Sequence, residues 1–542
     1  MKNILFVALV YLLSVNSAAQ TVVYNNTTFS SPLPFISNVD TLIIGNCNFQ
    51  NFSGEAIRFE NIDYVEIRNS NFSNITNTSS TRAVICGKDG NVVLLKNLYF
   101  DSIGGTAVRF PTDGESSPLK RLGTVLIDSV IINTTYDPGS FESNGIRVFL
   151  TDTLRIQNCI LKNITDNAIS LGRNSSGITQ YDQRIIFCEL MNNDIDSVLG
   201  NGIVASENSG FALVHNNKIS NIAYDGVGML SSEGDHGIYW QSPSALIYEN
   251  TLLNIQDGSI SGNKGIGISV RTNVKILQNE VGHCTGNGIA YWNDHPGSGY
   301  FEVSNNLVYD TGLNGISING SGSDANKPDS VYIIHNTVHN IYNSGLIHQY
   351  SPIAFNNMGS YNYIAGNLLL FDNITDTSYF IRFLGATPSQ NEAYNLYGDI
   401  NSGFVNIASH DYHLISTNQA INFVPLNITY LTVDKDNFLR NNPNDAGCYE
   451  YQLSANQNEI IASEIKIHPN PTLGQVIIDH NFHSSGFDVL LFNAEGKVIP
   501  SNIYSGNNKI IIDFSNQVEG IYFLEINNGT KMYHYKILKI GL

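Results

Sequence analysis

The sequence predicts an all-β solenoid, a fold in which short strands and turns form coils that stack along one axis. Three observations indicate it: a unit of about 29 residues recurs, each copy alternates apolar and polar residues, and no copy has a helical period. Composition agrees, since charged residues make up 14% of the 542 and glycine occurs 46 times. A repeat array can reach this length because each copy is buried against its neighbours.

One position can be followed through the repeats, because an apolar residue stands two places after it in nearly every copy. It is occupied by Asn46, Asn69, Asn97, Asp128, Asn158, Cys188, Asn217, Asn250, Asn279, Asn306, Asn336 and Asn367. An asparagine in a turn can donate and accept hydrogen bonds along the stack and so satisfy backbone groups of the next coil. We therefore predict an asparagine ladder inside the wall of the solenoid.

A second landmark is a strand that starts with a small residue and then alternates inward, outward and inward side chains. Gly267-Ile268-Ser269-Val270 is a clear copy, and Ala83-Val84-Ile85-Cys86 is read the same way, with Val84 inward. The stretch before this strand is longest between Asn217 and Ile238. Long loops on a rigid scaffold often carry function, although a solenoid also tolerates neutral changes of loop length.

Residues 40–385, with this ladder and these strands, resemble the right-handed parallel β-helix proteins of the pectate-lyase-like superfamily. The resemblance implies an all-β, right-handed parallel β-helix of about 12 coils. In that family the outer face of the Gly-Ile strand, walled by neighbouring loops, usually forms a carbohydrate cleft. The resemblance is specific for the fold and not for the reaction.

Both ends of the chain indicate export. Residues 1–19 read as a signal peptide, with Lys2, an apolar run from Ile4 to Val15, and small residues at 17–19 before Gln20. That run is too short to remain as a membrane-spanning helix, and we expect no transmembrane segment. The remaining domains are expected at 20–403 for the β-helix, 404–451 for a closing segment, 452–460 for a linker and 461–542 for a small β-sandwich.

The closing segment contains Asp411-Tyr412-His413-Leu414 and ends in Asp445-Ala446-Gly447-Cys448-Tyr449-Glu450. It resembles the segment that closes many secreted β-helix proteins with a D-I-G-A-[YF]-E-like string, from which Ala446 and Cys448 depart. An uncovered terminal coil would expose an open sheet edge, so a cap is needed there. We expect His413 and Asp445 to serve this cap rather than catalysis.

The last region has a different sequence pattern, with several short alternating strands and turn signals that favour a β-sandwich. It carries Pro469-Asn470-Pro471, Gly496-Lys497-Val498 and Gly520-Ile521-Tyr522. It closely resembles the type A C-terminal sorting domain of the type IX secretion system. The resemblance implies that residues 461–542 engage the type IX machinery, cross the outer membrane and are removed, leaving the protein secreted or attached to the cell surface.

Charge and cysteine usage exclude some functions. The net charge of −19 argues against nucleic acid as a partner. The six cysteines contain no CxxC pair, and their places inside strands favour buried free thiols over disulfides, although export would permit disulfides. No metal or other cofactor is expected; loop carboxylates could bind calcium, but their spacing does not indicate it. A monomer is expected.

The richest group of chemically active side chains lies in coils seven to nine. As catalytic candidates we take Asp235, His236, Tyr239, Lys264 and Arg271, and as substrate-binding candidates Arg109, Arg147, Glu233, Trp292, Asp294 and His295. The residues from 233 to 295 should lie within about 10 Å if two strand spacings separate them. The two arginines could bind carboxylate or sulfate groups of a polysaccharide, or be ordinary solvated charges. Asp235 and His236 could also simply cap a turn.

Two reactions fit this group. In a lyase, Arg271 or Lys264 would neutralise a uronic carboxylate while His236 or Tyr239 removes the adjacent proton. In a hydrolase, two of Glu233, Asp235 and Asp294 would act as a carboxylate pair. No diagnostic motif for either is present. We predict a secreted carbohydrate-active protein that cleaves polysaccharide, a lyase being favoured over a hydrolase; the alternative is a non-catalytic surface protein for glycan binding or adhesion.

Overall fold

The computed structural model describes residues 19–77, 83–110, 121–139, 142–172, 185–206, 209–224, 235–242, 245–257, 264–272, 274–292, 300–319, 330–341, 350–356, 361–370, 380–384, 390–398, 403–425, 428, 431–452, 465–468, 472, 474–480, 488–492, 499, 502–506, 509–518, 520–527 and 532–539. The chain divides into two compact units, residues 1–452 and 453–542. Among the described residues no helix is long and apolar enough to cross a membrane.

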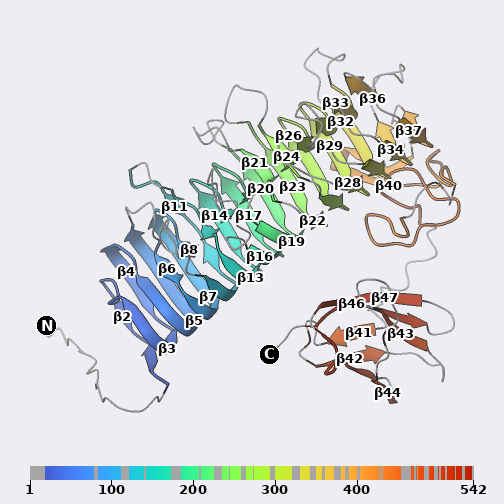
Figure 1. Cartoon of the computed structure of the whole chain (residues 1–542). Helices are drawn as coiled ribbons and strands as arrows, with labels where there is room; N and C mark the ends of the chain where they lie inside the picture. The colour runs from blue at the N-terminus through green and yellow to red at the C-terminus, as the bar shows by residue number, and fades with distance from the viewer. Residues whose placement is uncertain are drawn as a thin grey trace. The chain divides into compact units, whose positions relative to one another are not determined.

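The first unit is a parallel β-helix, so the predicted fold class is confirmed. Its described strands form one parallel sheet of 38 strands that is folded into three faces. Each strand pairs in parallel with the strand at the same place in the next coil, and Figure 1 shows this stack running from the blue to the yellow strands. The alternating apolar residues point into one continuous core, in which most side chains are fully buried.

The first face precedes the asparagine turn of each coil. It contains β1 (Thr21–Asn25), β3 (Ile36–Gly45), β5 (Ile57–Thr76), β7 (Gly90–Gly104), β9 (Leu122–Asp128), β13 (Thr151–Gln157), β16 (Ile185–Met191), β19 (Ser209–His215), β22 (Ala245–Tyr248), β25 (Lys275–Leu277), β28 (Tyr300–Ser304), β31 (Ser330–Ile334), β34 (Tyr361–Ala365) and β37 (Gln390–Ala393). The long strands β5 and β7 continue around the turn into the second face.

The second face follows the turn. It contains β2 (Thr28–Phe29), β4 (Asn48–Ser53), β10 (Ile131–Ile132), β11 (Thr135–Tyr136), β14 (Ile160–Ile164), β17 (Asp194–Val198), β20 (Lys218–Ile222), β23 (Thr251–Ile255), β26 (Glu280–Cys284), β29 (Leu307–Thr311), β32 (Thr337–Ile341), β35 (Leu368–Leu370) and β38 (Leu396–Gly398).

The third face consists of the Gly-Ile strands. It contains β6 (Ile85–Lys88), β8 (Val108–Phe110), β12 (Ile146–Val148), β15 (Ile169–Leu171), β18 (Ile203–Ala205), β21 (His236–Trp240), β24 (Ile266–Val270), β27 (Ile289–Trp292), β30 (Ile316–Asn319), β33 (Ile353–Asn356) and β36 (Ile381–Leu384). The predicted alternation holds around β21, β24 and β27.

One Gly-Ile strand differs from its predicted register by one residue. Ile85, rather than Val84, pairs with Ile57, and Cys86 therefore takes the outward place beside Arg58. A slip of one residue exchanges the inward and outward side chains of a strand. The run from Val84 to Cys86 is apolar throughout, so its alternation could not set the register.

Every coil turns from the first to the second face through a residue in the left-handed conformation. Its φ lies between 49° and 67° at fourteen equivalent positions, Asn26, Asn46, Asn69, Asn97, Ser129, Asn158, Asn192, Asn216, Glu249, Gln278, Asn305, His335, Gly366 and Tyr394. Asparagine and glycine tolerate this conformation best. We call these positions the left-handed row. They show that the described residues contain fourteen such turns, whereas about twelve coils were expected.

The asparagine ladder lies one residue after the left-handed row. It runs through eight buried residues, Asn193, Asn217, Asn250, Asn279, Asn306, Asn336, Asn367 and Asn395. From Asn217 onward, each side-chain oxygen accepts hydrogen bonds from the backbone N–H and the Nδ2 of the preceding ladder residue; for Asn306 accepting from Asn279 these are 2.9 and 3.0 Å. Each Nδ2 also donates to a carbonyl of a neighbouring coil, so the buried amides are satisfied.

The predicted ladder was therefore wrong in its first half. Asn46, Asn69, Asn97 and Asn158 belong to the left-handed row, Asp128 stands one place before it, and Cys188 lies within β16. In those coils the ladder position holds Cys47, Ser70, Leu98, Val130 and Cys159. Asparagine is favoured in the left-handed row because it tolerates that backbone conformation, and in the ladder because of its hydrogen bonds. The sequence pattern did not distinguish these two adjacent positions.

The closing segment does more than cap the last coil, because it runs back along the left-handed row. Asn437 donates to Glu249 (3.0 Å), and Gln278 and Asn305 donate to carbonyls of the segment at 2.7 and 2.8 Å. The N–H of Gly447 reaches the carbonyl of Gly366 at 2.7 Å. The segment thus covers five consecutive coils.

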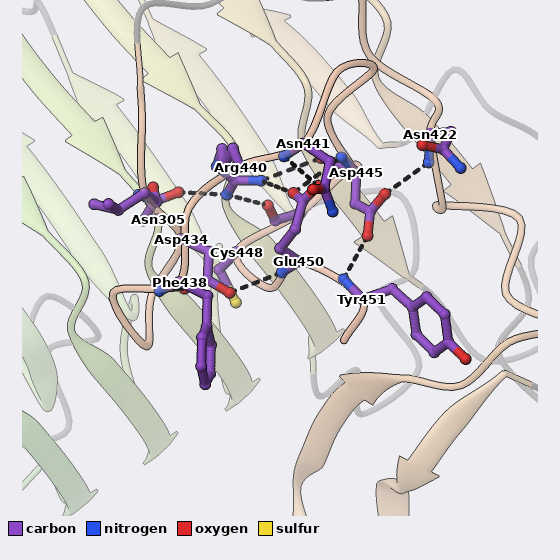
Figure 2. Close-up of polar contacts among 12 residues, drawn as sticks. Asn305, Asn422, Asp434, Phe438, Arg440, Asn441, Asp445, Cys448, Glu450 and Tyr451 are labelled. Carbon is purple, nitrogen blue, oxygen red and sulfur yellow. Dashed lines mark hydrogen bonds and ion pairs between the residues drawn. The ribbon is translucent and has the colours of Figure 1, made fainter. Parts of the chain in front are cut away.

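The inside of the closing segment is a polar network, drawn in Figure 2. Arg440 pairs with Glu450 at 3.2 Å, and Asp434 accepts from the N–H groups of Phe438 and Glu450 at 2.8 and 2.9 Å. Asp445 accepts from the N–H groups of Asn422 and Tyr451. Asp445 therefore holds the closing segment together, as expected. The segment also contains β39 (Phe404–Asn406), η4 (Ile407–Ser409) and β40 (Asp411–Leu414).

The second unit consists of two antiparallel sheets. One contains β41 (Ile465–His468), β42 (Gln475–His480), β45 (Lys509–Asp513) and β44 (Asn502–Gly506), and the other β43 (Asp488–Phe492), β46 (Gly520–Asn527) and β47 (Met532–Lys539). Side chains of both sheets share one core, including Val476, Ile512 and Leu524. This is the predicted small β-sandwich.

The six cysteines are all free and buried, which confirms the prediction for them. Burial raises the pKa of Cys159, Cys284 and Cys448 to about 12, so these thiols stay neutral and unreactive.

Candidate functional site

The outward side chains of the third face form one continuous row, because every strand keeps its register with the next. The row passes through Arg58, Cys86, Arg109, Arg147, Ser170, Val204, Tyr239, Ser269, Ala290, Ser317, Ala354 and Arg382. The side chains on either side of Tyr239, Ile238 and Trp240, are fully buried in the core. Tyr239 therefore points away from the core, although only 7% of the residue is exposed.

Arg109 and Arg147 are neighbours in this row and share one partner. Both pair with the carboxylate of Glu142, Arg109 at 3.2 Å, and both guanidinium groups lie over the ring of Phe149, at 4.9 and 4.7 Å. Four strand spacings, or about 19 Å, separate Arg109 from Tyr239. The structure thus does not bring the two arginines together with the candidates of coils seven to nine.

Tyr239, Gln241, Arg271 and Trp292 form a compact group at the ends of three successive strands. The hydroxyl oxygen of Tyr239 accepts hydrogen bonds from Nε of Arg271 at 3.2 Å and from Nε2 of Gln241 at 2.5 Å. The guanidinium of Arg271 also lies over the rings of Tyr239 and Trp292, 5.2 Å from each centroid. A cation, a phenolic hydroxyl and an indole are therefore held in contact.

Gln241 was not among the predicted candidates, although a signal for it was present. It follows the inward Trp240 just as Arg271 follows the inward Val270 and Trp292 follows the inward Tyr291. Because the three strands are in register, the residues that follow them, Gln241, Arg271 and Trp292, are also neighbours. Gln241 could have been found from the sequence in this way.

His236 occupies a position of a second asparagine ladder, which precedes the third face. Asn144, Asn167 and Asn201 bond in sequence, and the Oδ1 of Asn201 accepts from the backbone N–H of His236 at 3.0 Å. The ladder then resumes with Asn287 and Asn314. His236 therefore replaces an asparagine at the coil of the candidate site.

Burial decides the charge of His236, whose side chain is close to that of Tyr239. The residue is 4% exposed, and the two ring centroids are 5.0 Å apart. Desolvation, followed by the positive charges of Arg271 and Lys264, lowers the pKa of His236 from 6.5 to about 3. The imidazole is therefore neutral at any physiological pH.

Asp235, the residue before this histidine, forms an ion pair with Lys264. Asp235 is fully buried and has a φ of 80°, and its Oδ2 lies 3.6 Å from Nζ of Lys264. The carbonyl of Asp235 accepts from the N–H of Gly265 at 2.9 Å. The ion pair is thus built into the start of two adjacent third-face strands. The remaining candidates, Glu233, Asp294 and His295, lie outside the described residues.

Several polar atoms in this neighbourhood are buried and have no hydrogen-bond partner among the described residues. They include Nδ1 of His236, Oγ of Ser269 and the Nε1 atoms of Trp240 and Trp292. Ser269 pairs with Tyr239 across adjacent strands. Buried polar groups nearly always have partners, and exceptions often mark a binding or catalytic site. The group around Tyr239 is therefore the candidate site that the described residues support best.

Comparison with known proteins identifies the second unit. Residues 466–540 match the family described as the secretion system C-terminal sorting domain. The tail is a type IX sorting domain. Such a tail implies secretion or attachment at the cell surface through that system. The match covers the sorting domain alone, and no curated protein matches the chain.

One solved structure, titled "The complex structure of XylC with xylose", is similar to this chain over 73% of its residues and 67% of the other chain, at 10% identity and a TM-score of 0.35. A likeness at this TM-score does not bear on the candidate site.

Proposed function

We propose that this chain is an exported carbohydrate-active protein that cleaves an acidic polysaccharide on the third face of its β-helix. The observation that carries the proposal is the convergence of Arg271 and Gln241 on the hydroxyl oxygen of Tyr239, beside Trp292. Guanidinium groups suit carboxylates, and an indole offers a flat surface for a sugar ring. One uronic residue could engage all of these groups.

The reaction that fits this group best is a β-elimination. Arg271 would neutralise the uronic carboxylate, which makes the hydrogen on the adjacent carbon easier to remove. Tyr239, whose hydroxyl oxygen lies where Arg271 and Gln241 meet, would take this proton as the general base. The electron pair of that C–H bond forms a C=C bond as the C–O bond to the leaving sugar breaks, and the glycosidic oxygen takes a proton from water. His236, neutral and buried, would support the ring of Tyr239 rather than transfer a proton.

Hydrolysis is less well supported by the described residues. A hydrolase needs two carboxyl groups that reach the glycosidic bond. Asp235, one of the three candidates for that pair, is fully buried and paired with Lys264. Binding of glycan without cleavage is the second candidate function, because Arg271 and Trp292 would serve recognition equally well and Tyr239 is only 7% exposed.

The route out of the cell is part of the proposal. Residues 1–19 would direct export across the inner membrane, and the sorting domain would then be recognised by the type IX machinery and removed. The mature protein would contain the β-helix of residues 20–403 and the closing segment of 404–451, released from the tail within the linker of 452–460. It would act as a monomer on polysaccharide.

The test incubates the purified full chain with a panel of uronic polysaccharides and with neutral glycans. A lyase produces unsaturated ends, which absorb in the ultraviolet, whereas a hydrolase produces only new reducing ends. We expect unsaturated ends from at least one uronic substrate. If neither kind of end forms but calorimetry shows binding, the protein is a glycan-binding protein, and the cleavage proposal fails.

A further inference from the structure

Two histidines and an aspartate meet where the closing segment passes the second face. His283 and Asp310 occupy the same place in β26 and β29 of successive coils, and His410 ends η4 of the closing segment. One ligand atom of each lies within 4.8 Å of the other two. The Oδ2 of Asp310 is 3.1 Å from Nδ1 of His283 and 2.9 Å from Nε2 of His410.

Both imidazole rings are held in place by one buried tyrosine. His410 stacks on Tyr309, with ring centroids 4.2 Å apart and an angle of 15°, and His283 meets the same ring edge-on at 5.4 Å. The hydroxyl of Tyr309 donates to Oε1 of Glu280 at 2.9 Å. Burial raises the pKa of Tyr309, so it remains a donor. The three ligand atoms are thus preorganised by packing around them.

We propose that His283, Asp310 and His410 bind zinc or a similar divalent transition metal, which fastens the closing segment to the β-helix. Two imidazoles and one carboxylate suit zinc, whereas calcium and magnesium prefer oxygen ligands. Around a tetrahedral ion with bonds near 2.0 Å, ligand atoms lie about 3.3 Å apart, close to the two distances seen here. Three protein ligands leave the fourth position to water.

Exposure of the site allows an ion to enter. The side chains of His283, Asp310 and His410 are 39%, 21% and 28% exposed. The site draws on two coils and on the closing segment, so a bound ion would join parts of the chain that are 100 residues apart in sequence. Its residues are separate from the Tyr239 group on the third face, and the proposal does not depend on the polysaccharide function.

The chain itself supplies conservative substitutions for each ligand. His283 and Asp310 have left-handed φ values of 54° and 50°, and the equivalent residues of the preceding coils are Asn221 and Asn254. His410 has a φ of 58°. Asparagine tolerates this conformation, so His283→Asn, Asp310→Asn and His410→Asn remove a ligand without straining the backbone. A matched control is His215→Asn, since His215 pairs with Glu189 on the first face.

The experiment uses the full chain, purified without a histidine tag and dialysed against a chelator. Zinc is titrated by calorimetry, and the melting temperature is measured with and without zinc and with calcium. We expect one zinc per chain and a higher melting temperature with zinc but not with calcium. Each of the three ligand variants should bind zinc at least tenfold more weakly and lose the shift, whereas His215→Asn should keep both.

The proposal is overturned if zinc does not raise the melting temperature of the unmodified chain, or if the three ligand variants bind zinc as it does. In the first case the cluster is a hydrogen-bonded His–Asp–His group, and in the second zinc binds elsewhere. A circular dichroism spectrum of each variant, matching that of the unmodified chain, ensures that lost binding does not come from lost structure.

Discussion

Arg440 and Glu450 form an ion pair at 3.2 Å in which the side chains are 1% and 0% exposed. Arg440 also donates to the side chain of Asn305 at 2.7 Å and to the carbonyl of Gly447 at 2.9 Å, as Figure 2 shows. The pair therefore joins two parts of the closing segment to the left-handed row of the β-helix. Charges this deeply buried are stable only when each keeps its partners.

Glu450→Gln should destabilise the first unit strongly. It leaves the Arg440 guanidinium buried without its counter-charge, which typically costs about 3–5 kcal/mol. Denaturant unfolding of the chain measures the change. As the control, Arg68→Met breaks the exposed pair of Arg68 with Glu66 and should cost less than about 1 kcal/mol. Equal small effects from both variants would contradict the structural role assigned to the Arg440–Glu450 pair.

Asn279→Leu should cost about 3 kcal/mol or more of unfolding free energy. The amide of Asn279 donates to the carbonyl of Ile247 and to Asn306, and its oxygen accepts from Asn250. Leucine leaves these buried groups without partners, at about 1–3 kcal/mol each. In the left-handed row Asn69→Gly should cost under about 1 kcal/mol, because glycine accepts a φ of 49°. A ladder variant as mild as the row variant would refute the assignment of the ladder to Asn279.

His413 should make the closing segment sensitive to alkaline pH. Its Nδ1 and Nε2 lie 2.5 and 2.6 Å from the carboxylates of Asp411 and Asp436, and these contacts raise the pKa of His413 from 6.5 to about 9. A raised pKa stabilises the fold below pH 6.5, and the gain disappears as the pH rises through about 9. The lowered pKa of Asp436 adds stability that is lost toward acid pH, below its ordinary 3.8.

Unfolding of the chain and of His413→Gln between pH 5 and 10 tests this. The free energy of unfolding should be higher for the unmodified chain than for the variant at pH 6, and this difference should be absent above about pH 9.5. An advantage that does not change with pH would show that His413 acts by packing on Tyr449, whose ring centroid is 4.0 Å away, and not by its charge.

His236 should have the opposite effect, destabilising the fold in acid. Its pKa is about 3 in the folded protein and 6.5 in the reference state, so the unfolded chain takes up a proton first as the pH falls below 6.5. His236→Asn restores the ladder residue and removes this loss. As the pH falls from 7 to 4.5, the unfolding free energy of the variant should rise by about 2 kcal/mol relative to that of the unmodified chain. An NMR titration of His236 with a midpoint near 6.5 would contradict the account of its burial.

The fold could be predicted because its two main signals are local. Alternation of inward and outward residues set the Gly-Ile strands, and repeated turns set the coil length. The ladder was located correctly from Asn217 to Asn367, where an asparagine occupies the ladder position in every coil. Where apolar residues or cysteine take its place, as at Leu98 and Cys159, only the paired strands show the register.

The candidate site was predictable in part for the same reason. Strand register aligned Tyr239, Arg271 and Trp292, but burial could not be read from the sequence, so Asp235 and His236 looked like accessible groups. The His283–Asp310–His410 cluster was missed because His410 reaches it only when the closing segment turns back along the coils. Contacts between such distant segments leave no periodic signal in sequence.

The central claim is that Tyr239 and Arg271 act on a uronic polysaccharide. Tyr239→Phe removes the proton acceptor and Arg271→Gln removes the cation, while Arg382→Gln changes an arginine of the same outward row about 24 Å away. Formation of unsaturated ends by the full chain is compared among the three. We predict that kcat falls about 10²–10⁴-fold in Tyr239→Phe, with a similar loss of kcat/KM in Arg271→Gln, and that Arg382→Gln keeps full activity. Undiminished cleavage by Tyr239→Phe and Arg271→Gln would contradict the claim.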